Sequence, residues 1–171
     1  MLKDILNKLK RQNSTIVFAT AAITLALATI TMIGTPYPVD AQQQNSTKSG
    51  TFNYTQTNES GDPDWIIAGN WSLTGIDSSS PTFDATIDMA KPNGSAAHDH
   101  TVNDLAVSGE PSNQSNSTTI KGTTTITMRE GPVTDEPTTI TVNGNQISVY
   151  FDPAKIDDHF GNQSITGTVT E

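Results

Sequence analysis

The feature that most constrains the fold is an alternation of apolar and polar residues with a period of two. Its cleanest example is residues 82–89, whose apolar members are Phe83, Ala85, Ile87 and Met89. Successive side chains of a β-strand point to opposite faces, so this pattern predicts a strand that is buried on one face. The same period recurs at residues 65–73, 120–129, 140–151 and 165–170. Because helical periodicity is nearly absent, we expect an all-β fold.

About eight such strands, separated by clusters of Gly, Pro, Asn and Ser, predict a single antiparallel β-sandwich, Ig-like or jelly-roll-like, with a barrel as the alternative. Asn143-Gly144 lies between two apolar runs and predicts a type I′ hairpin turn. Residues 152–158 are expected to form one helical or 3₁₀ turn that leaves His159 in a loop. The expected core consists of Trp65, Ile67, Trp71, Leu73, Phe83, Ile87, Met89, Ile126, Met128, Ile140, Val142, Ile147, Val149 and Phe151.

The N-terminal segment has the charge order of an export signal. Lysines and an arginine precede an apolar run at residues 16–33, and prolines follow it. Residues 1–41 are therefore expected to be a signal peptide or an uncleaved membrane-anchor helix, and residues 42–49 a polar linker. Residues 50–171 would then form the β-sandwich domain outside the cytoplasmic membrane, either secreted or anchored to its outer face.

Charge and composition exclude several functions for the exported part. Of the 9 basic and 18 acidic residues, 5 and 16 lie beyond residue 41, which gives that part a formal charge of -11. Such a domain would repel nucleic acid and anionic lipid, so we expect contact with a membrane only through the N-terminal segment. The chain has no cysteine and no nucleotide-binding or hydrolase motif. We therefore expect no nucleotide, haem or iron–sulfur cofactor and no disulfide.

Three histidines form the only obvious set of metal ligands. His98 and His100 flank Asp99, and in a strand residues i and i+2 point to the same face about 6.6 Å apart. Their imidazoles can therefore turn toward one ion, while Asp99 points to the opposite face. A third nitrogen from His159 would give a three-histidine site with an open position for water or substrate. Copper or zinc suits these ligands best.

Asp157 and Asp158 precede His159, and either is expected to orient its imidazole by a hydrogen bond. Another interpretation remains open, in which His98 and His100 are exposed strand residues and His159 hydrogen-bonds a loop. A shared site requires His159 to approach the other two, and local sequence does not determine that approach.

Asn-x-Ser/Thr sequons are more frequent beyond residue 41 than the roughly 3 that composition alone would produce. The eight candidates are Asn45, Asn53, Asn58, Asn70, Asn93, Asn113, Asn116 and Asn162. Their excess favours glycosylation at the surface of an exported protein, although a Ser/Thr-rich strand composition also raises the number of matches.

Four segments carry a resemblance to known proteins. They are Phe-Asp-Ala-x-Ile-x-Met at residues 83–89, Gly-Ser-x-x-His-x-His at residues 94–100, Gly-Pro-Val at residues 131–133 and Ile-Asp-Asp-His-Phe-Gly at residues 156–161. Over residues 50–171 the chain resembles a group of exported β-rich proteins of ammonia-oxidising archaea. This resemblance implies an envelope location but no activity. The His-x-His strand is also similar to those of copper-zinc superoxide dismutases and chordin-type β-sandwich repeats, but three histidines are too few for the dismutases' paired metal sites.

The sequence thus predicts an envelope-associated protein that binds copper or zinc through His98, His100 and His159, with a metal ion or envelope components as partners. The alternative is a glycosylated structural or adhesion module without chemistry. A metal-dependent enzyme is a third hypothesis, which requires a pocket beside the same histidines. No residue is singled out as catalytic.

Overall fold

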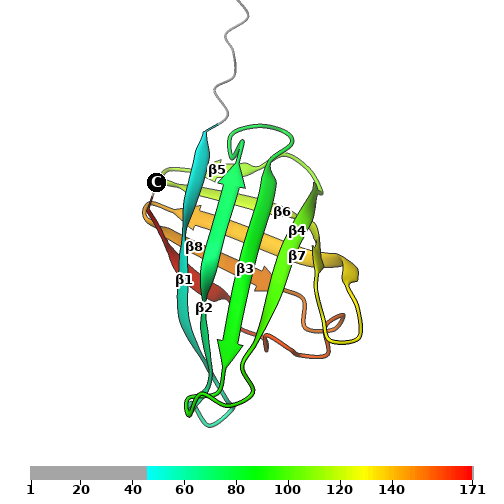
Figure 1. The fold of residues 1–171 in the computed structure, drawn as a ribbon. Coiled ribbons are helices and arrows are strands. Elements are labelled where there is room, and N and C mark those ends of the chain that lie inside the picture. Colours follow the sequence, from blue (N-terminus) through cyan, green and yellow to red (C-terminus); the bar gives the residue numbers. More distant parts are fainter. Residues whose placement is uncertain (1–45, 171) are drawn as a thin grey trace, which may run out of the picture. The chain divides into compact units, whose positions relative to one another are not determined.

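Nine antiparallel strands make up the computed structural model, which describes residues 46–170 (Figure 1). They are β1 (Thr47–Thr57), β2 (Pro63–Thr74), β3 (Thr82–Ala90), β4 (His98–Val107), β5 (Ser112–Gln114), β6 (Ser117–Ile126), β7 (Val133–Asn143), β8 (Gln146–Phe151) and β9 (Ile165–Val169). The all-β prediction is confirmed for these residues, among which no helix is long and apolar enough to span a membrane. The predicted leader or anchor at residues 1–41 lies outside the described residues.

One sheet runs through all nine strands and closes on itself. Its order is β4-β3-β2-β1-β9-β8-β7-β6-β5, and β4 also pairs with β6. Eight strands therefore form a closed antiparallel barrel, and the short β5 is attached outside the closure. In Figure 1, β1, β2 and β3 lie in front of β6, β7 and β8 and cross them. The two-sheet sandwich is not confirmed, and the barrel alternative describes the closed sheet.

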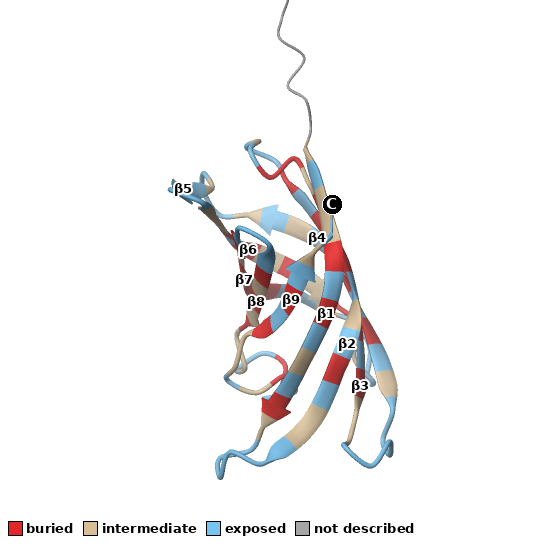
Figure 2. Cartoon of the chain, turned by 90° about the vertical axis from the view of Figure 1, so that its left-hand side faces the viewer, coloured by how far each residue is buried: buried red, intermediate tan, exposed pale blue. Residues whose placement is uncertain are grey.

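The interior of the barrel is filled by alternate side chains of the strands. Buried and exposed residues alternate along β1 and β2 in Figure 2. Twelve of the fourteen expected core residues are buried, whereas Trp65 and Met128 are only partly buried and border a cavity. The core also includes Phe52 and Val102, which lie on strands that the alternating pattern did not predict.

The hairpin between β7 and β8 is confirmed, but its turn type differs from the prediction. Asn143 pairs with Gln146, so the two central residues are Gly144 and Asn145. Gly144 has a φ of 57°, while Asn145 has a negative φ. A positive φ at the first central residue alone is typical of type II′ rather than type I′. β1 begins at Thr47, so the last three residues of the expected linker belong to this strand.

Residues 152–164 form a loop of successive turns that connects β8 to β9. The expected single helical turn is not completed, because Asp157 and Asp158 have φ values of 52° and 56°. These left-handed conformations cannot continue a right-handed helix. Ile156 and Phe160 of this loop are 2% and 1% exposed, so the loop contributes to the core.

Candidate metal centre

The structure brings together the three histidines that the sequence predicted. His159 Nε2 lies 2.9 Å from His100 Nε2 and 3.2 Å from His98 Nε2. One potential ligand atom from each residue lies within 4.8 Å of the other two. His98 and His100 come from the start of β4, and His159 comes from the loop at residues 152–164. A single ion could therefore contact all three side chains.

The period of β4 places two of these rings on one face. His100 is 3% exposed and points into the barrel, and His98 is half-buried at the strand's start. Asp99 between them is exposed, as expected for a residue on the opposite face. The two imidazole centroids lie 4.9 Å apart with nearly perpendicular planes. This crossed arrangement directs their edges toward His159.

Backbone carbonyl oxygens determine the tautomers of both β4 histidines. His98 Nδ1 lies 2.7 Å from the Ala96 oxygen, and His100 Nδ1 lies 2.6 Å from the Thr127 oxygen. A carbonyl oxygen only accepts, so each Nδ1 carries the proton and donates it. In the neutral ring, Nε2 is then the nitrogen without a proton, and its lone pair is available to a metal. The sequence predicted an orienting partner only for His159 and did not predict these two carbonyl contacts.

Ala96 and Phe160 help to hold the histidines, the first through a strained backbone and the second through packing. Ala96 has a φ of 53°, a left-handed conformation that costs a non-glycine residue roughly 1–2 kcal/mol. That conformation occurs in the residue whose carbonyl oxygen binds His98. Phe160 packs its ring against His100 and His159, with centroids 5.3 Å and 5.2 Å away. The core side chain adjacent to His159 therefore helps to hold two of the three imidazoles.

Asp157 and Asp158 belong to the turn before His159 and not to the groups that contact its ring. Both carboxylates are exposed, and no hydrogen bond within residues 46–170 joins either of them to the ring of His159. Their place is in the turn before His159, where the Asp158 carbonyl accepts a hydrogen bond from the Gly161 amide. The position of His159 thus follows from the backbone of the loop rather than from a carboxylate partner.

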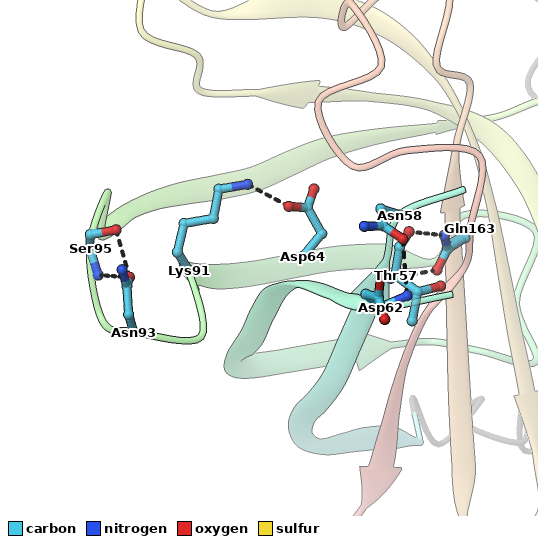
Figure 3. A network of polar contacts seen from close by, with 8 residues as sticks. All are labelled: Thr57, Asn58, Asp62, Asp64, Lys91, Asn93, Ser95 and Gln163. Carbon is cyan, nitrogen blue, oxygen red and sulfur yellow. Dashed lines mark hydrogen bonds and ion pairs between the residues drawn. The ribbon is translucent and has the colours of Figure 1, made fainter. Parts of the chain in front are cut away.

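The end of this loop is attached to β1. Gln163 Nε2 donates to the Thr57 oxygen at 2.7 Å (Figure 3). Gln163 Oε1 also accepts from Tyr54 Oη at 2.6 Å. Together with the buried Phe160, these bonds restrain the loop on both sides of Gly161. The imidazole of His159 is therefore supported by packing and by polar contacts.

Trp65 supports His98 from the other side. Its ring meets that of His98 edge to face, with centroids 5.3 Å apart. Lys91 Nζ lies 4.0 Å from the centre of the Trp65 ring and 2.6 Å from Asp64 Oδ1, as Figure 3 shows for the ion pair. The ion pair holds Lys91 in place, and the cation–π contact restricts the indole. The sequence had assigned Trp65 only to the core.

The electrostatics favour uncharged imidazoles. Burial lowers the pKa of His159 from 6.5 to about 4, and the facing rings of His100 and His98 contribute to the same shift. Burial also lowers the pKa of His100, although its bond to the Thr127 oxygen opposes the shift. Neutral histidine is the form that coordinates metals. At pH 7 the site is therefore prepared for a cation without first releasing protons from these two residues.

The spacing of the nitrogens fits a coordination sphere. In a tetrahedral site with metal–nitrogen distances of ~2.0–2.1 Å, neighbouring ligand nitrogens lie about 3.3 Å apart. The two observed separations from His159 Nε2 are 2.9 Å and 3.2 Å. The ligand atoms of His98 and His100 lie within 4.8 Å of each other and complete the triangle.

No protein-family model matches this chain, and no curated protein or solved structure matches it either. The geometry of the site is therefore the guide to its function. Three imidazole nitrogens at one point are the donor set of zinc and copper centres, which either act structurally or activate a bound ligand. The site can thus hold a metal ion, whose identity the donors alone do not determine.

The sequon asparagines are distributed over the surface. All seven within the described residues are exposed, and Asn45 lies outside them. Asn93 and Asn58 use their side-chain oxygens to cap turns, at 3.0 Å from the Ser95 amide and 2.9 Å from the Ser60 amide. None of the seven belongs to the histidine cluster.

Proposed function

We propose that this protein is an extracytoplasmic, envelope-associated metal-binding protein that holds one copper or zinc ion through His98, His100 and His159. One observation carries the proposal, namely the convergence of three imidazole Nε2 atoms, two of which have their tautomer set by backbone carbonyls. The acidic charge beyond residue 41 and the export-type N-terminal segment support the location.

A purely structural histidine cluster accounts less well for these contacts. In their neutral forms, His98 and His100 both present an Nε2 lone pair to the same nitrogen of His159. A proton on His159 Nε2 can be donated fully to only one of them at a time, which leaves the other lone pair facing a nitrogen. A cation at the centre accepts all three lone pairs together, so it satisfies the cluster where a shared proton does not.

The test is a calorimetric titration of the full chain with Zn(II) and, separately, Cu(II). We expect one equivalent to bind, and we expect His98→Ala and His159→Ala each to lower the affinity about 100-fold or more, because each removes one of three ligands. Asp84→Asn, an exposed change on β3, is the matched control and should bind as the wild type does. Circular dichroism of the metal-free variants verifies that they fold. Absence of binding by the wild type, or full affinity in His159→Ala, would contradict the proposal.

A second candidate function is a glycosylated structural or adhesion module of the envelope without chemistry. The exposure of all seven described sequon asparagines favours it. Intact-mass measurement of the protein purified from its native source would show hexose-sized increments that are lost after enzymatic deglycosylation. An unmodified mass would remove this support and leave the metal proposal unaffected.

A further inference from the structure

The three histidines form part of the wall of a cavity of about 600 Å³. Its other lining residues come from β2, from the segment before β4, from Asp99 of β4 and from the connection after β6. The exposed wall is mostly apolar, with Trp65, Ala96, Ala97 and Met128 contributing to it. A cavity of this volume and character is typical of sites for small organic molecules.

A metal in this site would keep an open coordination position. Within residues 46–170 the cluster of potential ligands contains three histidines and no carboxylate. Asp99 also lines the cavity, but it is exposed and lies on the opposite face of β4 from His100. Three protein ligands with a vacant fourth position are the pattern of zinc sites that exchange a bound molecule. All three histidines line the cavity, so the vacant position is reached from there.

Charge indicates what kind of molecule would fit. A divalent metal with three neutral imidazoles keeps a charge of +2, which favours an anionic oxygen as the fourth ligand. Arg129 is the one cationic residue that lines the cavity, and no hydrogen bond or ion pair within the described part of the chain engages its guanidinium. A guanidinium binds a carboxylate well because its fork of donors matches the two oxygens.

We infer that the cavity binds a small organic carboxylate, whose oxygen takes the fourth position on the metal while its apolar part packs against Trp65 and Met128. Arg129 lies at the same cavity and stabilises the bound anion. This inference rests on the proposed function, because the carboxylate is held by the metal. It extends that function from metal binding to recognition of a metal-bound ligand.

The experiment uses the full chain loaded with one equivalent of Cu(II), after calorimetry has shown that copper is bound. Benzoate is titrated into this protein while the visible d–d absorption and the paramagnetic resonance spectrum are recorded. We expect a saturable spectral change with benzoate and none with benzamide, a neutral molecule of nearly the same shape. Benzoate should bind more tightly than acetate, because its ring covers apolar wall that acetate leaves exposed.

The Arg129→Gln variant distinguishes anion binding in the cavity from metal binding. We expect this variant to bind Cu(II) as the wild type does and to bind benzoate about 10-fold more weakly, since one charge-assisted contact is lost. A copper-loaded protein whose spectra do not respond to benzoate would overturn the inference while the proposed function stood. Equal responses to benzoate and benzamide, or equal benzoate affinity in Arg129→Gln, would also overturn it.

One further variant tests whether the protein itself fills the fourth position. If the Met128 thioether were the fourth ligand, Met128→Leu would change the copper spectra without any added anion, which would overturn the inference. We expect unchanged spectra, with weaker benzoate binding as the only effect. Failure of the wild type to bind either Cu(II) or Zn(II) is a separate outcome, which refutes the proposed function and the inference with it.

Discussion

At the scale of single residues, His159 depends most on its neighbours. Its pKa falls from 6.5 to about 4 because the folded protein buries the ring and faces it with two other imidazoles. In the unfolded chain the ring regains its ordinary pKa of about 6.5. The resulting contribution to the free energy of unfolding is complete above about pH 6.5 and is lost as the pH falls toward 4.

We therefore expect the metal-free protein to lose stability between pH 7 and pH 5, with His159 contributing about 1–2 kcal/mol once solvent screening of a half-buried ring is considered. His159→Gln removes this contribution. The measurement is urea unfolding at both pH values in the presence of a chelator. Equal losses of stability in the wild type and in His159→Gln would show that the ring is not held uncharged.

Glu136 gives stability the opposite dependence on pH. Its side chain is 0% exposed, and neither carboxyl oxygen has a hydrogen-bond partner within the described residues. Burial raises its pKa from 4.5 to about 7. The folded state thus binds the proton more tightly than the unfolded state, so this group costs stability as the pH rises from about 4.5 through 7.

Glu136→Gln should raise the free energy of unfolding by roughly 2 kcal/mol at pH 8.5 and change it little at pH 5, where the native carboxyl is already neutral. Urea unfolding at the two pH values measures the difference. The exposed Asp135→Asn on the same strand is the control, for which we expect no comparable pH-dependent gain. A gain of the same size at pH 5 would point to packing rather than to charge.

At the scale of elements, the loop at residues 152–164 links the core to the site. Phe160 is 1% exposed, and its ring packs on Phe151 at 5.2 Å and on His100 at 5.3 Å. The same side chain therefore stabilises the barrel and positions the residue before it, His159. Loss of its packing should affect both stability and metal affinity.

Phe160→Leu should destabilise the protein by about 1–2 kcal/mol and weaken zinc binding several-fold, because the loop loses part of its anchor. Phe83→Leu is the matched control, since Phe83 is also 1% exposed but lies on β3, where it pairs with Leu73 rather than with a site residue. Calorimetric zinc titration of both variants, alongside thermal unfolding, compares the effects. A similar loss of zinc affinity in Phe83→Leu would mean that general loosening, not the loop anchor, weakens the site.

At the scale of the whole molecule, the site joins two distant parts of the chain. His98 and His100 lie at the start of β4, whereas His159 lies between β8 and β9. The ligands converge only when the sheet is closed and the loop is packed, so the unfolded chain does not present them together. A metal should therefore bind the native state in preference to the unfolded state.

We expect free Zn(II) at 100 times its dissociation constant to raise the free energy of unfolding by about 2.7 kcal/mol. Chemical unfolding with and without zinc measures this gain. His98→Ala should show little of it at the same zinc concentration, whereas Asp84→Asn should show all of it. A gain that persists in His98→Ala would place the stabilising ion elsewhere.

Much of the local structure was predictable because strand periodicity is a local property. The alternation around Phe83 and Ile87 identified β3 and its buried face correctly. The His-x-His spacing likewise placed His98 and His100 on one side of β4. Short-range patterns were less informative about geometry that depends on pairing register, which is why the turn at Gly144 was assigned one residue too early.

The sequence by itself determined which segments are strands, which of their faces are buried and which residues can bind a metal, because these properties depend on neighbours along the chain. Only the tertiary structure decided that the strands close into one sheet, through pairs as distant as Gly50 with Val169. It also decided that His159 meets the other histidines and that the Ala96 and Thr127 carbonyls orient them. A period of two is the same in a sandwich and in a barrel, and every residue has a carbonyl, so long-range hydrogen bonding alone makes these distinctions.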